Sequence, residues 1–217
     1  MTETARQTTP AAPGSRRTTR RHGRVLERAI YDAVLSEMAE QGFDRLTLEG
    51  VAKRAGTGKA SLYRRWPGKL DLVVETFQQS LPGPESVPVT GDLRGDLLGC
   101  LRQIANVMAG PVGAAMRRSL SYAHQHPELA DAVRQRVIEP RQRALWMILA
   151  AGAERGEVRA DALAPECVFA GPAIILQQFL ANRLETIPDE MITRIVDNVV
   201  LPMIRPCRHG RSARGGA

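Results

Sequence analysis

Apolar residues recur along most of this chain with the three- and four-residue spacing of α-helices, and the alternation typical of β-strands is nearly absent. The first such stretch, Arg24 to Gln41, carries one apolar stripe made of Leu26, Ile30, Ala33, Val34 and Met38. Gly42 suits the end of this helix, and Phe43 can fold back under the bundle that follows. The pattern predicts an all-α protein.

Three shorter helices are predicted next. The first begins at Thr47, whose hydroxyl can accept a hydrogen bond from a free amide of the first turn, and it ends before Gly56. The second is short, from Lys59 to Arg65, because Pro67 disfavours helical geometry in the residue before it. The third begins near Gly68, and its apolar residues can pack on the first three helices.

The rest of the chain divides by composition. Residues 81–91 hold three prolines and read as a linker, and longer helical patterns follow, with Pro140 expected to kink or break one of them. Residues 1–22 lack periodicity, which is typical of disorder. We expect a disordered basic arm (1–22), a helix-turn-helix domain (23–80), the linker (81–91), a helical body (92–204) and a basic disordered tail (205–217).

Charge is distributed unevenly, although the net charge is +7. Residues 1–80 hold 14 basic and 9 acidic side chains, whereas residues 81–204 hold 12 and 14. Between Gly50 and Leu70 there are six Lys or Arg and no acid. This asymmetry predicts a polyanionic partner for the N-terminal part. Basic residues at the two ends of the chain could serve solubility alone.

A short basic helix after a tight turn is typical of a helix-turn-helix DNA reader, whose second helix enters the major groove. Lys59 can donate to guanine, Ala60 can contact a thymine methyl, and Ser61 or the Tyr63 hydroxyl can reach the DNA. Leu62 and Trp66 read as core residues, and Tyr63 could also be one. The candidate double-stranded DNA contacts are Thr47, Gly58, Lys59, Ala60, Ser61, Tyr63, Arg65 and Lys69. Four arginines of the arm could enter a flanking minor groove or be passive: Arg16, Arg17, Arg20 and Arg21.

Residues 24–77 resemble the N-terminal domain of the TetR family of bacterial transcriptional regulators. The matching residues are Thr47, Val51, Ala52, Ala55, Gly56, Lys59, Ser61, Leu62, Tyr63, Trp66, Lys69, Asp71 and Leu72. The chain departs from the family at four positions, namely Thr57, Gly58, Arg65 and Trp66, so base preference does not carry over. The resemblance implies an Ω-shaped homodimer, a DNA-binding head and a ligand-sensing helical body.

The last two helices are the expected dimer surface. The segment 165–184 is apolar on more than one side, so one side can face a second copy of the chain, and Gly171 and Ala173 would permit close approach. The candidate dimer residues are Phe169, Ile174, Phe179, Ile192, Ile195, Val196 and Val199. The alternative is that these helices form the core of a monomer.

The resemblance also places a ligand pocket within residues 92–184. Met and Trp side chains adapt to apolar ligands, and Gln can orient one by a hydrogen bond. The candidate pocket residues are Met108, Met116, Tyr122, Trp146, Met147, Phe169 and Gln177, each of which could instead be a core residue. We expect a largely apolar small-molecule effector.

Other chemistry is not indicated. Cys100 and Cys167 read as reduced core thiols, the histidines lack the spacing of metal ligands, and nothing points to a cofactor. The chain shows no catalytic motif, signal sequence or membrane span. We therefore expect a cytoplasmic, ligand-responsive repressor that is not an enzyme. An activator or architectural DNA-binding protein without a ligand is the alternative, and a protein-only interaction module would leave the basic helix unexplained.

Overall fold

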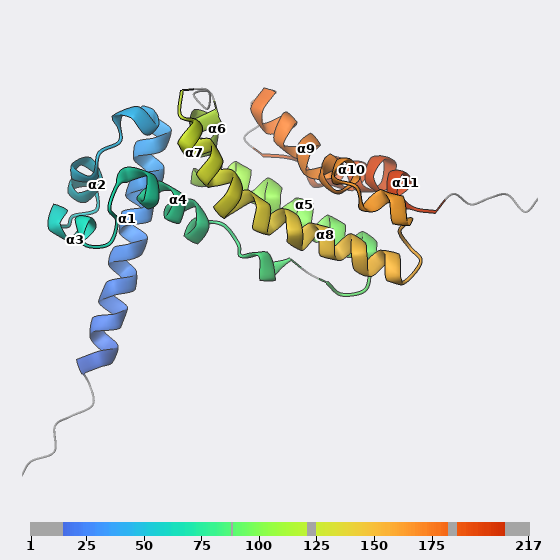
Figure 1. The fold of residues 1–217 in the computed structure, drawn as a ribbon, viewed down its shortest axis with the longest axis horizontal. Coiled ribbons are helices and arrows are strands. Elements are labelled where there is room, and N and C mark those ends of the chain that lie inside the picture. Colours follow the sequence, from blue (N-terminus) through green and yellow to red (C-terminus); the bar gives the residue numbers. More distant parts are fainter. Residues whose placement is uncertain (1–14, 88, 121–124, 182–185, 207–217) are drawn as a thin grey trace, which may run out of the picture.

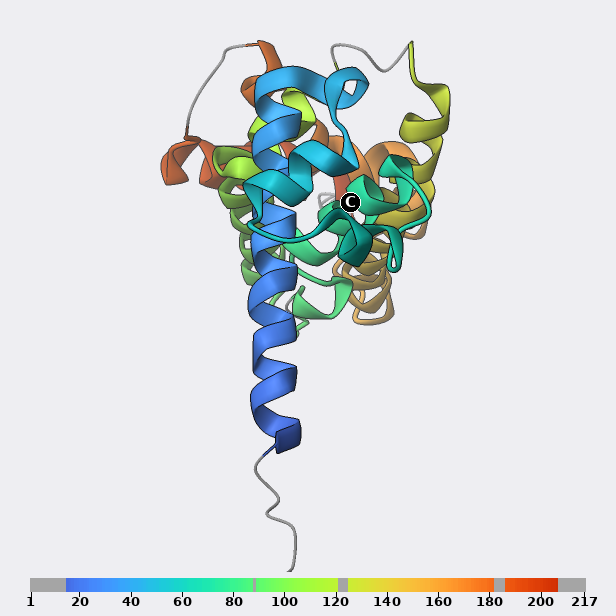
Figure 2. The ribbon, with the colours of Figure 1, turned by 90° about the vertical axis from the view of Figure 1, so that its left-hand side faces the viewer.

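The computed structural model describes residues 15–87, 89–120, 125–181 and 186–206, and every regular element within these ranges is helical (Figure 1). The N-terminal head consists of α1 (Ser15–Arg45), α2 (Leu48–Arg54), α3 (Lys59–Tyr63) and α4 (Lys69–Ser80). α1 is the longest helix, and its N-terminal part projects beyond the other elements (Figures 1 and 2).

α1 begins earlier than the sequence pattern predicts. Residues 15–22, which include the four arginines Arg16, Arg17, Arg20 and Arg21, are helical, so the expectation of a disordered arm is wrong for this part. The expectation of disorder was based on the absence of a periodic apolar pattern in residues 1–22. Extending an existing helix requires no apolar face, however, and Arg is a good helix former. Residues 1–14, and residues 207–217 of the expected tail, lie outside the described residues.

The other end of α1 is as predicted. Gly42 interrupts the helical geometry with φ of 79°, in the left-handed region that glycine tolerates best. This change of direction buries Phe43.

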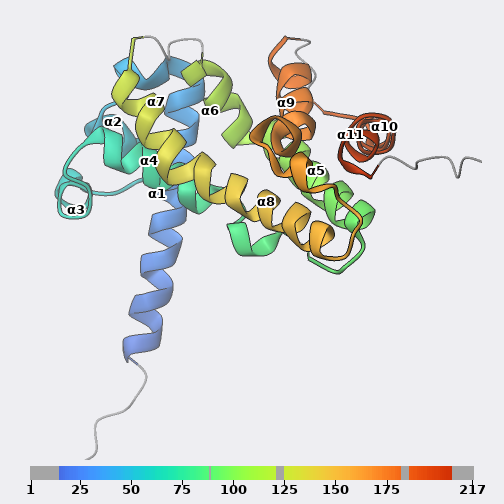
Figure 3. The ribbon, with the colours of Figure 1, turned by 45° about the vertical axis from the view of Figure 1, so that its right-hand side comes forward.

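The linker contains the short 3₁₀-helix η1 (Pro84–Ser86), and the body follows it. The body consists of α5 (Leu93–Ala109), α6 (Pro111–Leu120), α7 (Pro127–Val133), η2 (Arg134–Ile138), α8 (Glu139–Glu154), η3 (Ala160–Leu163), α9 (Pro165–Ala181), α10 (Asp189–Ile195), η4 (Val196–Val200) and α11 (Leu201–Ile204). α5 and α8 lie side by side (Figures 1 and 3). No helix among the described residues is long and apolar enough to cross a membrane.

Pro140 does not break the helical run, which was one of the two effects expected of it. The chain stays helical from Pro127 to Glu154 because η2 is a π-helical turn, in which the Glu139 amide donates to Arg134 O, five residues back. Proline cannot donate to the carbonyl four residues before it. Here that carbonyl, Arg136 O, accepts a hydrogen bond from Gln78 Nε2 of α4 at 3.0 Å. The carbonyl released by the proline thus ties the body to the head.

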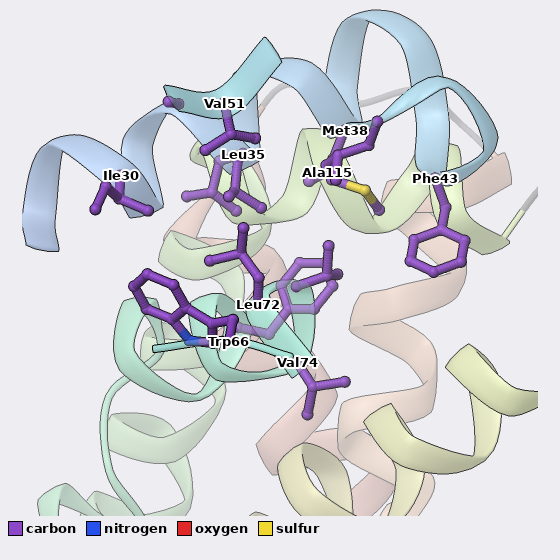
Figure 4. Close-up of a cluster of buried hydrophobic side chains, with 14 of the residues drawn as sticks. Ile30, Leu35, Met38, Phe43, Val51, Trp66, Leu72, Val74 and Ala115 are labelled. Atoms are coloured by element: carbon purple, nitrogen blue, oxygen red, sulfur yellow. The ribbon is translucent and has the colours of Figure 1, made fainter. Parts of the chain in front are cut away.

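Two apolar cores organise the molecule, and they do not separate at the linker. The first core joins the head to parts of the body, since Val112 and Ala115 of α6, Leu129 of α7 and Val137 of η2 pack with the head residues. Figure 4 shows Ala115 among the buried side chains of α1, α2 and α4. The second core lies between α5, α8, α9 and the last helical run, which consists of α10, η4 and α11. α6 and α7 therefore belong to the packing of the head.

Candidate functional sites

The α2–α3 turn has the local structure that its sequence predicts. Thr47 caps α2, and its Oγ1 accepts a hydrogen bond from the Gly50 amide at 3.0 Å. Gly56 has φ of 66°, which turns the chain sharply between the two helices. α3 is shorter than predicted, ending at Tyr63, and Gly58 precedes it without a side-chain cap.

α3 is anchored to the head through its inner face. Leu62 and Trp66 are buried, as predicted. The Trp66 indole donates to Glu75 at 2.9 Å, and the Tyr31 hydroxyl donates to the other oxygen of the same carboxylate at 2.8 Å. Burial, followed by this carboxylate, raises the pKa of Tyr31. The opposite face of α3 consequently points toward solvent.

Six Lys or Arg side chains lie between Gly50 and Leu70, and three of them bind other groups of the protein. Arg54 binds Glu40 through two hydrogen bonds of 2.8 and 2.5 Å, and its Nε donates to Glu37 at 2.9 Å. Arg65 pairs with Glu27 of α1 at 2.8 Å.

Lys69 is the third of these cations. Its ammonium donates to Phe43 O at 3.0 Å and to Asp44 O at 3.3 Å, and it lies 4.4 Å from the centre of the Phe43 ring. Arg65 and Lys69, both expected DNA contacts, thus also bind α1: Arg65 pairs with Glu27, and Lys69 donates to the carbonyls of Phe43 and Asp44.

The other three cations are exposed and form no ion pair within the described ranges: Lys53, Lys59 and Arg64. Arg64 was missed by the sequence analysis. It lies two residues after the buried Leu62, which is the opposite side of a helix. That spacing was available in the sequence as a signal of exposure.

An acidic side chain also belongs to this face. Tyr63 is 50% exposed, and its hydroxyl donates to Glu49 Oε1 at 3.0 Å. The hydrogen bond raises the pKa of Tyr63. A backbone hydrogen bond and then this hydroxyl lower the pKa of Glu49, so Glu49 is an anion at neutral pH. A phosphate contact by Tyr63 would require its hydroxyl to leave Glu49.

A cavity of about 330 Å³ lies between the linker and helices α5, α6, α8 and α9. Met108, Met116 and Phe169 line it, among the residues expected in a pocket. Trp146 and Met147 do not line it and are exposed, because their neighbours Leu145, Ile148 and Leu149 occupy the inner face of α8. Gln177 is exposed on α9 and accepts a hydrogen bond from Gln178. Tyr122 lies outside the described residues.

The cavity also has lining residues that the sequence analysis did not select. These include Cys100, whose thiol pKa is raised to about 11 by burial, and the polar residues Gln103, Arg141 and Gln142. The remaining lining is almost entirely apolar, drawn partly from the linker residues Leu81, Pro82 and Val87. An apolar molecule would be largely removed from water there.

Most residues expected at a dimer surface are buried within the single chain. Phe179, Ile192, Ile195 and Val196 are at most 5% exposed, so the expectation is corrected for these four. Their helices pack on α5, where Arg94 binds Asp197 and Arg102 binds Asp189, each by two hydrogen bonds.

The other expected dimer residues differ in exposure. Val199 is 40% exposed, whereas Phe169 and Ile174 are half-buried. A side chain at Gly171 would meet Leu101 and Val200 of the same chain, so this glycine permits close packing within the subunit.

Within the described ranges, no cluster of three or more His, Cys, Asp or Glu side chains could hold a metal ion.

Two family models match this chain. "Bacterial regulatory proteins, tetR family" matches residues 30–76, and "Tetracyclin repressor-like, C-terminal domain" matches residues 87–199, just over half the chain. The chain belongs to the TetR family of bacterial transcriptional regulators. It is thus a DNA-binding, helix-turn-helix transcriptional regulator of a non-enzymatic family, and the predicted family, all-α fold and helix-turn-helix head are confirmed.

Individual proteins agree with this membership of the TetR family. The chain is 31% identical over 179 residues to an HTH-type transcriptional regulator of Mycobacterium tuberculosis, covering 82% of this chain and 87% of that one. It is 28% identical over 192 residues to the DNA-binding transcriptional repressor TetR of Mycobacteroides abscessus, covering 85% and 96%.

Solved structures share the TetR fold. A TetR family transcription regulator with 27% identity has a TM-score of 0.61, with 83% of this chain and 99% of that one covered. A TetR regulator from Agrobacterium tumefaciens has a TM-score of 0.66 at 21% identity, with 83% and 94% covered, which shows likeness of fold alone.

Proposed function

We propose that this regulator is a homodimeric repressor that acts in the cytoplasm and releases its operator when a small molecule occupies the 330 Å³ cavity. The observation that carries the proposal is the shared wall between cavity and head. Val137 is buried in the head core and lines the cavity, and Met116 packs against the same core and also lines it. A ligand that shifts either side chain acts directly on the packing of α1 and α4.

The proposed DNA contacts are the exposed residues of the α2–α3 face. Lys59 donates to base edges, and Ala60 and Ser61 follow it along α3. Thr47, Gly58 and Tyr63 lie toward the backbone, and Lys53 and Arg64 supply positive charge without a protein partner in the described ranges. Arg65 and Lys69 contribute through the fold of the head.

The proposed dimer uses the outward side of α9 and of the last helical run. Ala173 and Leu180 of α9 and Val199 of η4 are exposed apolar residues there, with Ile174 half-buried beside them. Two heads held at fixed spacing can read two half-sites, which a single short α3 cannot do with useful affinity. Sedimentation at micromolar concentration should give about twice the chain mass of 23.8 kDa. A species of the chain mass would remove the dimer from the proposal.

The decisive experiment uses DNA and ligand together. The purified protein first selects its operator from genomic fragments, and a thermal-shift screen finds ligands. A bound ligand should weaken operator affinity by about five- to 150-fold, the usual range of such coupling. Gln142→Trp is the control, since Gln142 is half-buried, lines the cavity and lies outside the proposed dimer and DNA surfaces, so a large side chain there should block the ligand and spare DNA binding. Unchanged operator affinity with ligand bound would contradict the proposal.

Activation, or DNA binding without a ligand, is the competing function. The Mycobacteroides abscessus relative is named a repressor, which supports repression here. A promoter fusion in cells lacking the protein separates the two. Transcription from the bound promoter should rise for a repressor, and a fall would identify an activator.

A further inference from the structure

Arg141 of α8 is the one charged side chain among the described residues that line the cavity. It is half-buried, and no described carboxylate lies within salt-bridge distance of it. Other arginines of the body differ: Arg94 and Arg102 each bind an aspartate through two hydrogen bonds. The cavity therefore combines an apolar wall with one cation that forms no ion pair in the described part of the chain.

Backbone carbonyls hold the Arg141 guanidinium in place. Nη1 donates to Val137 O at 2.7 Å, Nε donates to Pro82 O at 3.1 Å, and Nη2 donates to Gln78 O at 3.5 Å. Carbonyls satisfy N–H groups, but they do not neutralise the positive charge. Burial lowers the pKa of Arg141, against the weaker opposite influence of Glu85, which shows that its surroundings disfavour the charged form.

We infer that the effector is an amphipathic monoanion, whose apolar body fills the cavity and whose carboxylate pairs with the Arg141 guanidinium. This inference rests on the proposed effector function of the cavity. A planar guanidinium matches a carboxylate with two parallel hydrogen bonds. Gln103 and Gln142 also line the cavity, and the Gln103 amide donates to Ser86 Oγ at 2.8 Å. A neutral apolar ligand would bury the cation further without an anion, and a cationic ligand would be repelled.

The same pairing gives the ligand a path to the head. Gln78 O belongs to α4, and Pro82 O belongs to the linker that follows it. The guanidinium has five N–H groups and uses three for backbone carbonyls, so a carboxylate can bind the remaining two and draw the guanidinium toward the ligand. Binding of the anion thus weakens the contact of α4 and the linker with α8, which is a differential interaction of the kind that shifts a conformational equilibrium.

Matched acids and alcohols test the inference. Decanoate is compared with 1-decanol, and 4-phenylbutyrate with 4-phenylbutan-1-ol, by calorimetry on the full-length protein without DNA. At least one acid should bind tenfold or more tightly than its alcohol. Arg141→Gln should abolish this preference. Arg143→Gln should preserve it, because Arg143 is an exposed arginine on the same helix that does not line the cavity.

Two outcomes of this comparison would overturn the inference. The acids could bind no better than their alcohols, or the preference for acids could survive Arg141→Gln. If Arg141→Gln does not fold, the unaltered protein still provides a test. The pKa of bound ¹³C-carboxyl decanoate, followed by NMR, must lie below that of free decanoate, since an adjacent guanidinium favours the anion. A raised pKa would mean an unpaired, desolvated carboxylate and would refute the pairing.

Operator binding measured with the same compounds separates this inference from the proposed function. If acids are preferred through Arg141 but the operator stays bound, the anion site stands and the release mechanism fails. If acids and alcohols bind equally and both release the operator, the release mechanism stands and the anion site fails.

Discussion

At the scale of single residues, the Glu49 carboxylate is the clearest feature of the proposed DNA face, because an anion lies beside Tyr63 where phosphate is expected. Glu49→Gln should tighten operator binding about threefold, since removing one exposed charge near a phosphate relieves up to about 1 kcal/mol of repulsion in water. Fluorescence anisotropy with labelled operator at fixed salt measures this. Glu40→Gln is a poor control because Glu40 binds Arg54, so Glu154→Gln serves instead, since Glu154 of α8 is exposed and forms no ion pair within the described ranges. Weaker binding by Glu49→Gln would mean that Glu49 positions Tyr63 for contact.

The Cys100 thiol gives a second residue-scale prediction. With its pKa raised to about 11, it stays protonated at pH 8, where about one thiol in a thousand is the reactive thiolate. Alkylation of Cys100 should be at least tenfold slower than that of the half-buried Cys167, and it should rise about tenfold per pH unit up to pH 10. Peptide mass mapping separates the two sites. Equal rates at pH 8 would show that the cavity opens to solvent.

For single residues, the sequence predicted which side chains are exposed more reliably than which groups those side chains contact. Lys59 and Tyr63 are exposed as predicted, because alternation around the buried Leu62 is a local pattern. The protein contacts of Arg65 and Lys69 were not predicted because their partners are distant: Glu27 lies 38 residues away, and Phe43 lies 26 residues away. Only the assembled head brings these groups together.

At the scale of elements, the glycine turn between α2 and α3 makes a direct prediction. Gly56→Ala should destabilise the protein by about 1 kcal/mol, because a side chain disfavours the left-handed geometry at φ of 66°. There is open space around the position, so no clash contributes. Gly23→Ala in α1 is the matched control, also in open space, and it should stabilise by about 0.5–1 kcal/mol. Urea unfolding measures both, and a neutral Gly56→Ala would mean that the turn relaxes.

The positions of the helices were largely predictable, because apolar spacing and helix-terminating Gly and Pro residues determine structure within a few neighbouring residues. Predictions about the elements were wrong where the structure depends on contacts between segments that are distant in the sequence. α1 extends to Ser15 by propagation from a packed helix, and Pro140 is accommodated because Gln78 of α4 satisfies Arg136 O. The buried state of Ile192 and Val196 depends on α5, which no pattern within their own helix reveals.

At the scale of the whole molecule, the first core predicts that head and body unfold together. Val137→Ala should lower the free energy of unfolding by about 2 kcal/mol through loss of buried volume, although Val137 lies outside the head in sequence. Fluorescence of buried Trp66, read in a Trp146→Phe background, should lose its native signal at the same urea concentration as circular dichroism. Protein concentration is held fixed because a dimer's stability depends on it.

Trp146→Phe alone is the control for that measurement, since Trp146 is 45% exposed and its replacement should leave the midpoint unchanged. If the Trp66 fluorescence were lost at a lower urea concentration than the circular dichroism, the head would be an independent domain.

The π-helical turn at residues 134–138 allows one continuous helical run to serve both cores. Before it, Leu129 and Val133 face the head; after it, Leu145 and Ile148 face the body. A π-turn holds one residue more than an α-turn, and one residue corresponds to about 100° of helical rotation. Deleting the exposed Gln135 would therefore leave every apolar side chain intact and still turn one half of the run away from its core. The number of residues in this segment, rather than their chemistry, sets the angle between its two faces.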